Sequence, residues 1–284
     1  MRATSEAPVA EPQPVKRSGG GGVRGRPRAT AGGLASVEIN GVGHSFGALS
    51  VIDRLELSAA PGEVLGIVGP SGCGKSTLLE LVGGLREPTA GRIAVDGDAA
   101  PRARLARCAY MPQRDLLLPW LSAIDNAALA LRNRGASRAA ARRAAHPLFE
   151  RFGLAGFERT RPHELSGGMR QRIAFLRTLL AGKQVLLLDE PFASLDAITR
   201  AEMQEWLAEA LAAESRTVIL VSHDTEEALY LSDRLVVLSP RPTRAVAELA
   251  APGARTRPRT EAVTAAGFTS AREDALRALV EGRE

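Results

Sequence analysis

A glycine-rich run in the first third of the chain constrains its fold more than any other feature. Residues 69–77 read Gly-Pro-Ser-Gly-Cys-Gly-Lys-Ser-Thr, which satisfies the pattern G-x-x-x-x-G-K-[ST] of a phosphate-binding loop. The apolar run 64–68 before the loop predicts a buried strand, and 76–82 predict the opening of a helix. Glycines let backbone N–H groups surround phosphate oxygens, and a helix N-terminus attracts negative charge. The chain is therefore predicted to bind the phosphates of a nucleoside triphosphate.

Such loops occur in kinases, GTPases, helicases and transport ATPases, so the downstream sequence has to discriminate among them. The segments that do so read Leu-Ser-Gly-Gly-Met-Arg-Gln-Arg at 165–172, Val-Leu-Leu-Leu-Asp-Glu-Pro at 185–191, Ser-Leu-Asp at 194–196 and Val-Ile-Leu-Val-Ser-His-Asp at 218–224. In this order they resemble the ATP-binding subunit of an ABC transporter, over about residues 36–250. The Leu-Ser-Gly-Gly signature is the discriminating piece, because other families with this loop lack it.

The resemblance implies an α/β fold, a P-loop NTPase of the ABC type. A mainly parallel sheet would form the core, with an antiparallel β subdomain and an inserted helical subdomain. We expect a disordered, basic, Pro/Gly-rich tail at 1–34, because that segment has too few apolar residues to form a core. An ABC ATPase domain is expected at 35–251, with its helical subdomain at about 115–180, followed by a linker and C-terminal helix at 252–284.

The spacing of apolar residues agrees with this organisation. Residues 37–39 and 55–57 predict antiparallel strands, and further strands are predicted at 92–97 and 108–111. The stretch 122–152 is predicted to be helical, with Ser137 as a cap, and Pro147 predicts a kink or a late start. A terminal helix is predicted at 270–281, after a Pro/Arg-rich linker. The second half alternates as βα units do: helix 166–181, strand 184–189, helix 197–213, strand 217–222, helix 225–231 and strand 234–238.

Composition and charge exclude several other classes. The length of 284 residues and a hydrophobic content of 45% are enough for one large domain with a core. The net charge is +5, but residues 1–34 carry +4 of it, so no nucleic-acid partner is expected. Two cysteines form no disulfide framework or metal-ligand spacing, which is typical of a reducing cytosol. No apolar stretch approaches the ~18 residues of a membrane span, so transport would require a separate membrane chain.

The expected cofactors are ATP and Mg²⁺. Lys75 should reach the β- and γ-phosphates. The Ser76 hydroxyl and Asp189 should hold Mg²⁺, since a carboxylate at the end of an apolar strand is costly without a cation. The ATP-binding residues of the loop are expected to be Gly69, Pro70, Ser71, Gly72, Cys73, Gly74, Lys75, Ser76 and Thr77.

Four residues are candidates for catalysis of the β–γ bond cleavage: Lys75 and three more that the resemblance supplies. It assigns Glu190 as the general base for the attacking water, Gln113 as a contact to both Mg²⁺ and that water, and His223 as a contact to the γ-phosphate. The alternatives are a charge-pairing glutamate and a structural histidine. The loop after Gln113 would face the transmembrane partner.

A second anion-binding helix N-terminus is predicted at Ser166, Gly167 and Gly168. One triphosphate needs only one such site. The resemblance therefore implies that this site serves the ATP of a second ATPase subunit, in a head-to-tail homodimer with ATP between the subunits. It places Asp196 at that interface. Met169 replaces the Gln commonest at its position, a change that also occurs in the importer branch described below.

Two further residues are candidates at the nucleotide. The resemblance assigns Phe46 to the aromatic position that stacks on adenine, where Tyr is usual; the alternative is a core phenylalanine. Cys73 lies beside Lys75 and at a helix N-terminus, which both favour the thiolate. We therefore expect Cys73 to react with alkylating reagents and Cys108, on a buried strand, to react slowly.

Residues 116–126 and 233–242 are similar to segments of nitrate, taurine and aliphatic sulfonate importers. This implies an ATP-hydrolysing subunit at the cytoplasmic face of the membrane, peripheral, energising solute uptake through a separate permease and served indirectly by a solute-binding protein. One alternative is an importer of a thiamine-precursor pyrimidine. Another is a soluble, non-transport ABC ATPase, although such proteins usually carry coiled-coil insertions or two cassettes. A small-molecule kinase would not explain the signature.

Overall fold

The strands of a parallel sheet position the candidate site. The computed structural model describes residues 34–193, 195–213 and 216–282, so the expected tail, apart from Leu34, and Ser194 lie outside the described residues. Strands β3 (Val64–Val68) and β6 (Val185–Asp189) are buried at every residue, as strands covered on both faces are. The sheet order is β5 (Cys108–Met111), β6, β7 (Thr217–Ser222), β3, β8 (Arg234–Leu238) and β9 (Ala245–Ala250).

All neighbouring strands of this sheet are parallel except β8 and β9, which are antiparallel. The register pairs Val68 with Ser222 and Asp189 with Val221, so β3, β6 and β7 end at one edge. A second, antiparallel sheet has the order β2 (Leu49–Ala59), β1 (Val37–Phe46) and β4 (Ala90–Val95). The predicted parallel core and antiparallel subdomain are confirmed.

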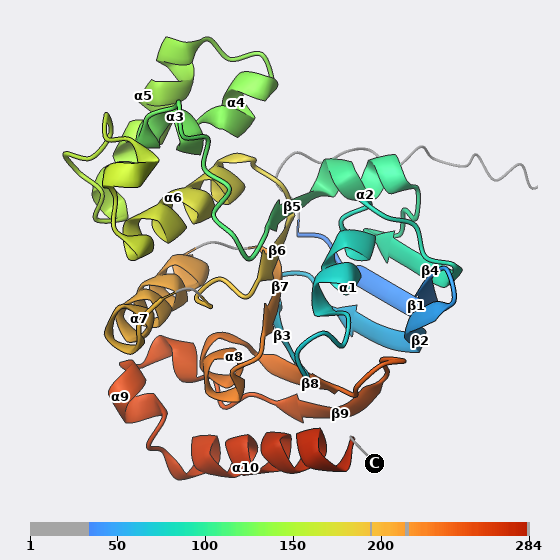
Figure 1. Ribbon diagram of the computed structural model, residues 1–284. Helices are drawn as coiled ribbons and strands as arrows, with labels where there is room; N and C mark the ends of the chain where they lie inside the picture. Colours follow the sequence, from blue (N-terminus) through green and yellow to red (C-terminus); the bar gives the residue numbers. More distant parts are fainter. Residues whose placement is uncertain (1–33, 194, 214–215, 283–284) are drawn as a thin grey trace, which may run out of the picture. The chain divides into compact units, whose positions relative to one another are not determined.

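The helices between residues 75 and 180 form two groups around the parallel sheet (Figure 1). Helix α1 (Lys75–Val82) lies between the two sheets, and α2 (Pro101–Arg107) connects β4 to β5. A group of helices lies beside the β5 edge: α3 (Ala123–Ala127), α4 (Leu129–Asn133), α5 (Arg138–Arg151), the 3₁₀ turn η1 (Pro162–Glu164) and α6 (Gly167–Leu180). This group is the predicted helical insertion.

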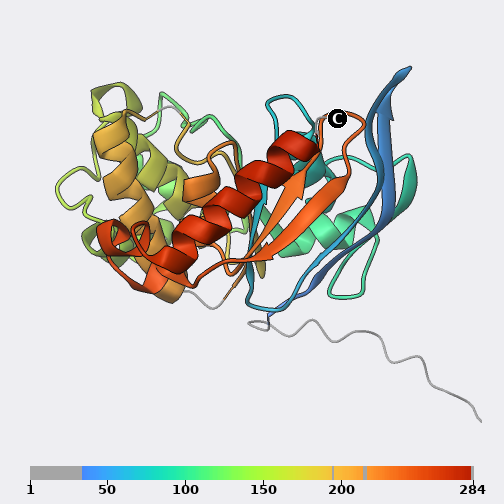
Figure 2. The ribbon, with the colours of Figure 1, turned by 90° about the horizontal axis from the view of Figure 1, so that it is seen from below.

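The remaining helices follow the later strands. They are α7 (Ala197–Ala213), α8 (Thr225–Leu231), the 3₁₀ turn η2 (Ala254–Thr256), α9 (Arg259–Ala262) and α10 (Ala266–Glu281). Helix α10 runs across β8 and β9, as Figure 2 shows from below. Among the described residues, no helix combines the length and apolarity needed to span a membrane.

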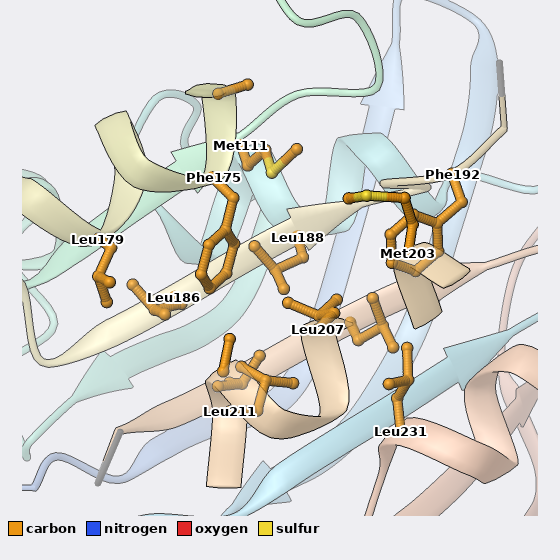
Figure 3. Packing of buried hydrophobic residues seen from close by; sticks show 14 of the residues in the cluster. Met111, Phe175, Leu179, Leu186, Leu188, Phe192, Met203, Leu207, Leu211 and Leu231 are labelled. Atoms are coloured by element: carbon orange, nitrogen blue, oxygen red, sulfur yellow. The ribbon is translucent and has the colours of Figure 1, made fainter. Parts of the chain in front are cut away.

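The alternation along each strand divides the core in two. Leu186 and Leu188 of β6 pack with α6 and α7, while Val185 and Leu187 belong to the cluster around α1. Figure 3 shows the first cluster, in which Phe175 and Leu207 lie next to Leu188. Burying each such side chain contributes about 1.5–3 kcal/mol. These contacts fix the strand ends from which the candidate residues project.

Three expectations about elements are wrong. Helix α5 begins at Arg138, so of the two alternatives for Pro147 the late start is wrong, because Ala141, Ala145 and Phe149 share a buried face that extends past the proline. The Ser137 cap is confirmed, since its hydroxyl accepts from the Ala140 N–H at 3.2 Å. The expected linker 252–260 contains η2 and the start of α9, and the terminal helix begins at Ala266 instead of 270. Helix α2 and strand β9 were not predicted.

Candidate functional site

The glycine-rich loop joins β3 to α1 and forms one wall of a cavity of about 380 Å³. Gly72 and Gly74 have φ angles of +74° and +123°, which only glycine adopts readily. A side chain at Gly74 would also lie 2.7 Å from Val51. The loop can therefore curl only with glycine at these positions. The residues that line the cavity are Phe46, Leu49, Val51, Ser71, Gly72, Gly74, Lys75, Ser76, Thr77, Gln113, Glu190 and Arg241.

Lys75 is buried and folds back onto its own loop. Its Nζ donates to the carbonyl oxygens of Gly69 at 2.9 Å and Pro70 at 3.2 Å. It also lies 3.7 Å from Oε1 of Glu190. A buried ammonium group needs such acceptors. Since Lys75 also lines the cavity, an anion bound there would compete with these acceptors for the ammonium group.

The Glu190 carboxylate contacts the other catalytic candidates. Its Oε2 accepts from Gln113 Nε2 at 3.2 Å and lies 3.1 Å from His223 Nδ1. Its φ of +44° is unusual for a residue with a side chain and costs about 1–2 kcal/mol. The Glu190 N–H donates to the Val221 carbonyl at 2.8 Å, which anchors this conformation on β7. The structure thus brings Lys75, Gln113, Glu190 and His223 together.

Asp189 has different partners from those of its neighbour Glu190. One oxygen, Oδ2, accepts from the Tyr110 hydroxyl at 2.8 Å. The other, Oδ1, is buried without a hydrogen-bond partner. Burial raises the pKa of Asp189, against the hydrogen bonds from Tyr110 and Ser76 that lower it. A buried, unsatisfied carboxylate oxygen beside a serine hydroxyl fits a divalent cation, which prefers oxygen ligands. Tyr110 was not predicted as a site residue, because no local pattern links it to Asp189.

The environment of the Cys73 thiol differs from what the sequence predicted. It belongs to the loop, and its N–H donates to the Pro70 carbonyl at 3.2 Å, but its side chain is only 2% exposed and lies outside the cavity lining. Burial raises the pKa of the Cys73 thiol, outweighing the attraction of Lys75. The expectation of a reactive thiolate is therefore wrong. Gly69 and Pro70 also lie behind the lining, where their carbonyls accept from Lys75.

Phe46 lies at the edge of the cavity rather than in the core. Its side chain is 43% exposed, so the alternative of a core phenylalanine is wrong. The His44 ring contacts it edge-on at 4.8 Å between centroids, and the Arg86 guanidinium lies 5.0 Å from its centroid. An exposed ring beside the phosphate-binding loop is available for stacking on a planar base.

The signature residues form a separate group. The Ser166 hydroxyl caps α6 by accepting from the Met169 N–H at 3.2 Å. A Cβ atom at Gly167 would lie 3.2 Å from the Leu195 side chain, and one at Gly168 would lie 3.1 Å from the Thr199 side chain. Asp196 caps the following helix, since its Oδ1 accepts from the N–H groups of Ile198 and Thr199, each at 3.1 Å. Neither Asp196 nor the signature residues line the cavity of their own chain.

Comparisons with known proteins agree with this geometry. The family model described as "ABC transporter" matches residues 52–193. Formylaminopyrimidine import ATP-binding protein ThiZ of Halalkalibacterium halodurans is 45% identical over 71% of this chain and 78% of its own length. Aliphatic sulfonates import ATP-binding protein SsuB 1 of Rhodococcus jostii is 44% identical over 82% of this chain and 90% of its own. Taurine import ATP-binding protein TauB of Burkholderia pseudomallei is 44% identical over 71% and 77%.

A solved structure is also similar. A dimeric ATP-binding cassette, MJ0796, captured in a post-hydrolysis state with ADP and Pi, aligns with a TM-score of 0.66 at 27% identity. The alignment covers 76% of this chain and 99% of that one. The chain therefore belongs to the ABC transporter family, and it is an ATP-binding and ATP-hydrolysing protein of that family.

Proposed function

We propose that this chain hydrolyses ATP in the cavity of the glycine-rich loop and thereby energises uptake of a small solute. The observation that carries the proposal is the convergence of Lys75, Gln113 and His223 on the Glu190 carboxylate, at the wall of a cavity that a phosphate-binding loop forms. Triphosphate hydrolysis needs positioned phosphates, an oriented water and stabilisation of negative charge. The convergent groups can supply all three.

The binding step assigns roles to the loop. Backbone N–H groups of 72–77 would hold the phosphates, and Lys75 would exchange the carbonyls of Gly69 and Pro70 for phosphate oxygens. The adenine ring would stack on Phe46. Ser76, Asp189 and Gln113 would hold Mg²⁺, which supplies charge neutralisation on the phosphate oxygens. When Lys75 turns away, Glu190 loses a counter-charge and becomes a better hydrogen-bond acceptor.

The hydrolytic step rests on Glu190. Its carboxylate would take a proton from the attacking water as general base. Gln113 and His223 would keep the carboxylate in place, because each lies within hydrogen-bond distance of Oε2. His223 would also contact the γ-phosphate as it passes from ADP, the leaving group, to the attacking water. The water-attack geometry then depends on the left-handed backbone of Glu190.

A second copy would complete the site. The signature residues Ser166, Gly167 and Gly168 present a helix N-terminus but do not line their own chain's cavity. In a head-to-tail homodimer they would contact the ATP of the other subunit, with Asp196 at the interface. The dimeric state of the similar cassette supports this arrangement.

The names of the relatives support a choice of partner and solute. Their names describe import of taurine, aliphatic sulfonates and a formylaminopyrimidine, so a separate permease would carry the solute and a solute-binding protein would deliver it. This chain would sit at the cytoplasmic face of the membrane, peripherally. The favoured solute class is a sulfonate, taurine or nitrate; a thiamine-precursor pyrimidine is the alternative.

Reconstitution tests the proposal. The chain would be placed in proteoliposomes with the permease and solute-binding protein encoded nearest to it, and uptake of labelled taurine, an alkanesulfonate, nitrate and formylaminopyrimidine compared. We expect MgATP-dependent uptake of one of these, and no uptake with Glu190→Gln. ATP hydrolysis without any associated permease activity would instead favour a soluble ABC ATPase.

A further inference from the structure

Arg241 reaches the nucleotide cavity from a distant part of the chain. It lies in the turn between β8 and β9, and it lines the cavity together with the glycine-rich loop. A Cβ atom placed on Gly72 would lie 3.8 Å from Arg241 Nη2. The guanidinium group therefore borders the glycine-rich loop at Gly72.

The turn that carries Arg241 is fastened to the loop. Thr243, two residues on, is 1% exposed, and its hydroxyl donates to the Cys73 carbonyl. Its N–H donates to the Val51 carbonyl at 2.8 Å, and its carbonyl accepts from the Asp53 N–H at 3.1 Å. These bonds tie the turn to both the glycine-rich loop and β2. The position of Arg241 relative to Gly72 is therefore set by buried contacts.

The charge of Arg241 is also available. The neighbouring Arg244 is paired with Asp53 through its guanidinium. Within the part of the chain that the structure describes, no carboxylate forms an ion pair with Arg241. The other cationic lining residue, Lys75, already contacts two carbonyls and Glu190. An exposed guanidinium beside a phosphate-binding loop has fork-shaped donors that match phosphate oxygens.

We propose that Arg241 binds the phosphate chain of the nucleotide, as an ionic contact supplied from outside the glycine-rich loop. The proposal rests on the proposed function, because it requires ATP in this cavity. It makes Arg241 a binding residue for the nucleotide, positioned by Thr243. Because the side chain is exposed, the contact should weaken as salt screens it.

Two substitutions in the full-length chain separate charge from packing. Arg241→Met keeps most of the aliphatic length and removes the charge, whereas Arg241→Lys keeps the charge. We expect Arg241→Met to weaken binding of ATP and ADP about 3- to 10-fold in low salt, and Arg241→Lys to recover most of that loss. The difference in nucleotide affinity between Arg241→Met and wild type should shrink at 0.5 M salt. Arg102→Ala, which removes an exposed arginine of α2 outside the cavity, should leave affinity unchanged.

The measurement is a fluorescence titration with a labelled ATP analogue, with melting temperatures taken in parallel. Equal affinity of Arg241→Met and wild type in low salt would overturn the proposal. A loss that is the same for Met and Lys and independent of salt would also overturn it, because it would indicate packing. Failure of the proposed function is distinguishable, since wild type itself would then show no saturable ATP binding.

Discussion

His223 Nδ1 lies 3.1 Å from Glu190 Oε2, although the two residues are 33 positions apart and follow different strands. The pairing arises because β6 and β7 are adjacent and parallel, so that the residues after their carboxyl ends meet. Gln113 contacts the same oxygen from the loop after β5, the strand on the other side of β6. A carboxylate held from two sides has little rotational freedom, which suits a general base.

Replacing Glu190 with Gln should lower the rate of ATP hydrolysis by about 10²- to 10⁴-fold, because the amide cannot accept the proton of the attacking water. ATP affinity should stay close to wild type, and gel filtration with ATP should detect an accumulated dimer. Glu56→Gln, an exposed position on β2, is the control and should hydrolyse normally. Hydrolysis by Glu190→Gln within twofold of wild type would remove Glu190 from its proposed role.

The His223–Glu190 contact predicts non-additive losses. His223→Ala should slow hydrolysis, because Glu190 loses one of its two fixing contacts and the γ-phosphate loses a donor. The double variant, His223→Ala with Glu190→Gln, should be scarcely slower than Glu190→Gln alone, since both residues act on one water. Single-turnover hydrolysis of all four proteins measures the coupling. Fully multiplicative losses would indicate independent roles.

Lys75→Ala should weaken ATP binding about 10- to 100-fold, since a charge-assisted contact to phosphate contributes roughly 1.5–3 kcal/mol. The variant should remain folded, because the shortened side chain leaves space next to the cavity through which water can reach the carbonyls of Gly69 and Pro70. Titration with a fluorescent ATP analogue gives the affinity. Lys183→Ala, whose lysine contacts the Ala106 carbonyl away from the cavity, serves as the matched control. Unchanged affinity in Lys75→Ala would contradict the assignment of the loop.

Both cysteines should react slowly in the folded protein. Burial raises the pKa of Cys73, and it raises the pKa of Cys108 to about 12, so little thiolate exists at neutral pH. A maleimide time course, followed by mass spectrometry of the peptides, should give labelling far slower than in guanidinium chloride. Labelling of native Cys73 as fast as of the denatured chain would show that the loop opens readily.

Stability should depend on pH through Asp125, which ties α3 to α5. The hydrogen bond from Arg142, followed by that from Arg138, holds the pKa of Asp125 well below its usual range. A lowered pKa in the folded state means that the stabilisation is complete above the unfolded value of about 4 and is lost as pH falls through the folded pKa. Asp125→Asn should therefore destabilise the protein by about 1–3 kcal/mol at pH 7, the exposed arginines reducing the cost.

Urea unfolding at several pH values measures this effect. The difference in free energy of unfolding between wild type and Asp125→Asn should decrease below about pH 4, where the carboxylate of the unfolded chain becomes protonated. Asp274→Asn is the control, because Asp274 and Arg277 form a pair exposed on α10 and should contribute little. A gap that stays constant from pH 7 to pH 3 would mean that the effect of Asp125→Asn is not ionic.

Local sequence patterns predicted much of the site because its chemistry is carried by short, contiguous segments. The loop at 69–77 needs glycine at fixed positions to curl, and the apolar runs 64–68 and 185–189 suit only strands covered on both faces. The roles of Glu190 and His223 were expectations from the family resemblance, and the structure shows that they meet because β6 and β7 are adjacent, parallel strands that end at one edge. The errors at Pro147 and at the start of α10 came from tertiary burial, which keeps a helix intact where its local sequence is unfavourable.

Contacts between distant segments were decided by tertiary structure alone. No pattern links Thr243 to Cys73, or Tyr110 to Asp189, since these pairs are 170 and 79 positions apart. The Cys73 thiol has its pKa raised because neighbouring elements exclude water from it, a property that its sequence neighbours Gly74 and Lys75 do not encode. Sequence by itself determined that residues 69–77 form a glycine-rich loop after a buried strand and that Asp189, Glu190 and His223 stand at the ends of apolar strands, through backbone conformation and side-chain chemistry. Burial and charge pairing depend on what the fold packs around each group, so only the tertiary structure decided that Cys73 is shielded and that Arg241 borders the cavity.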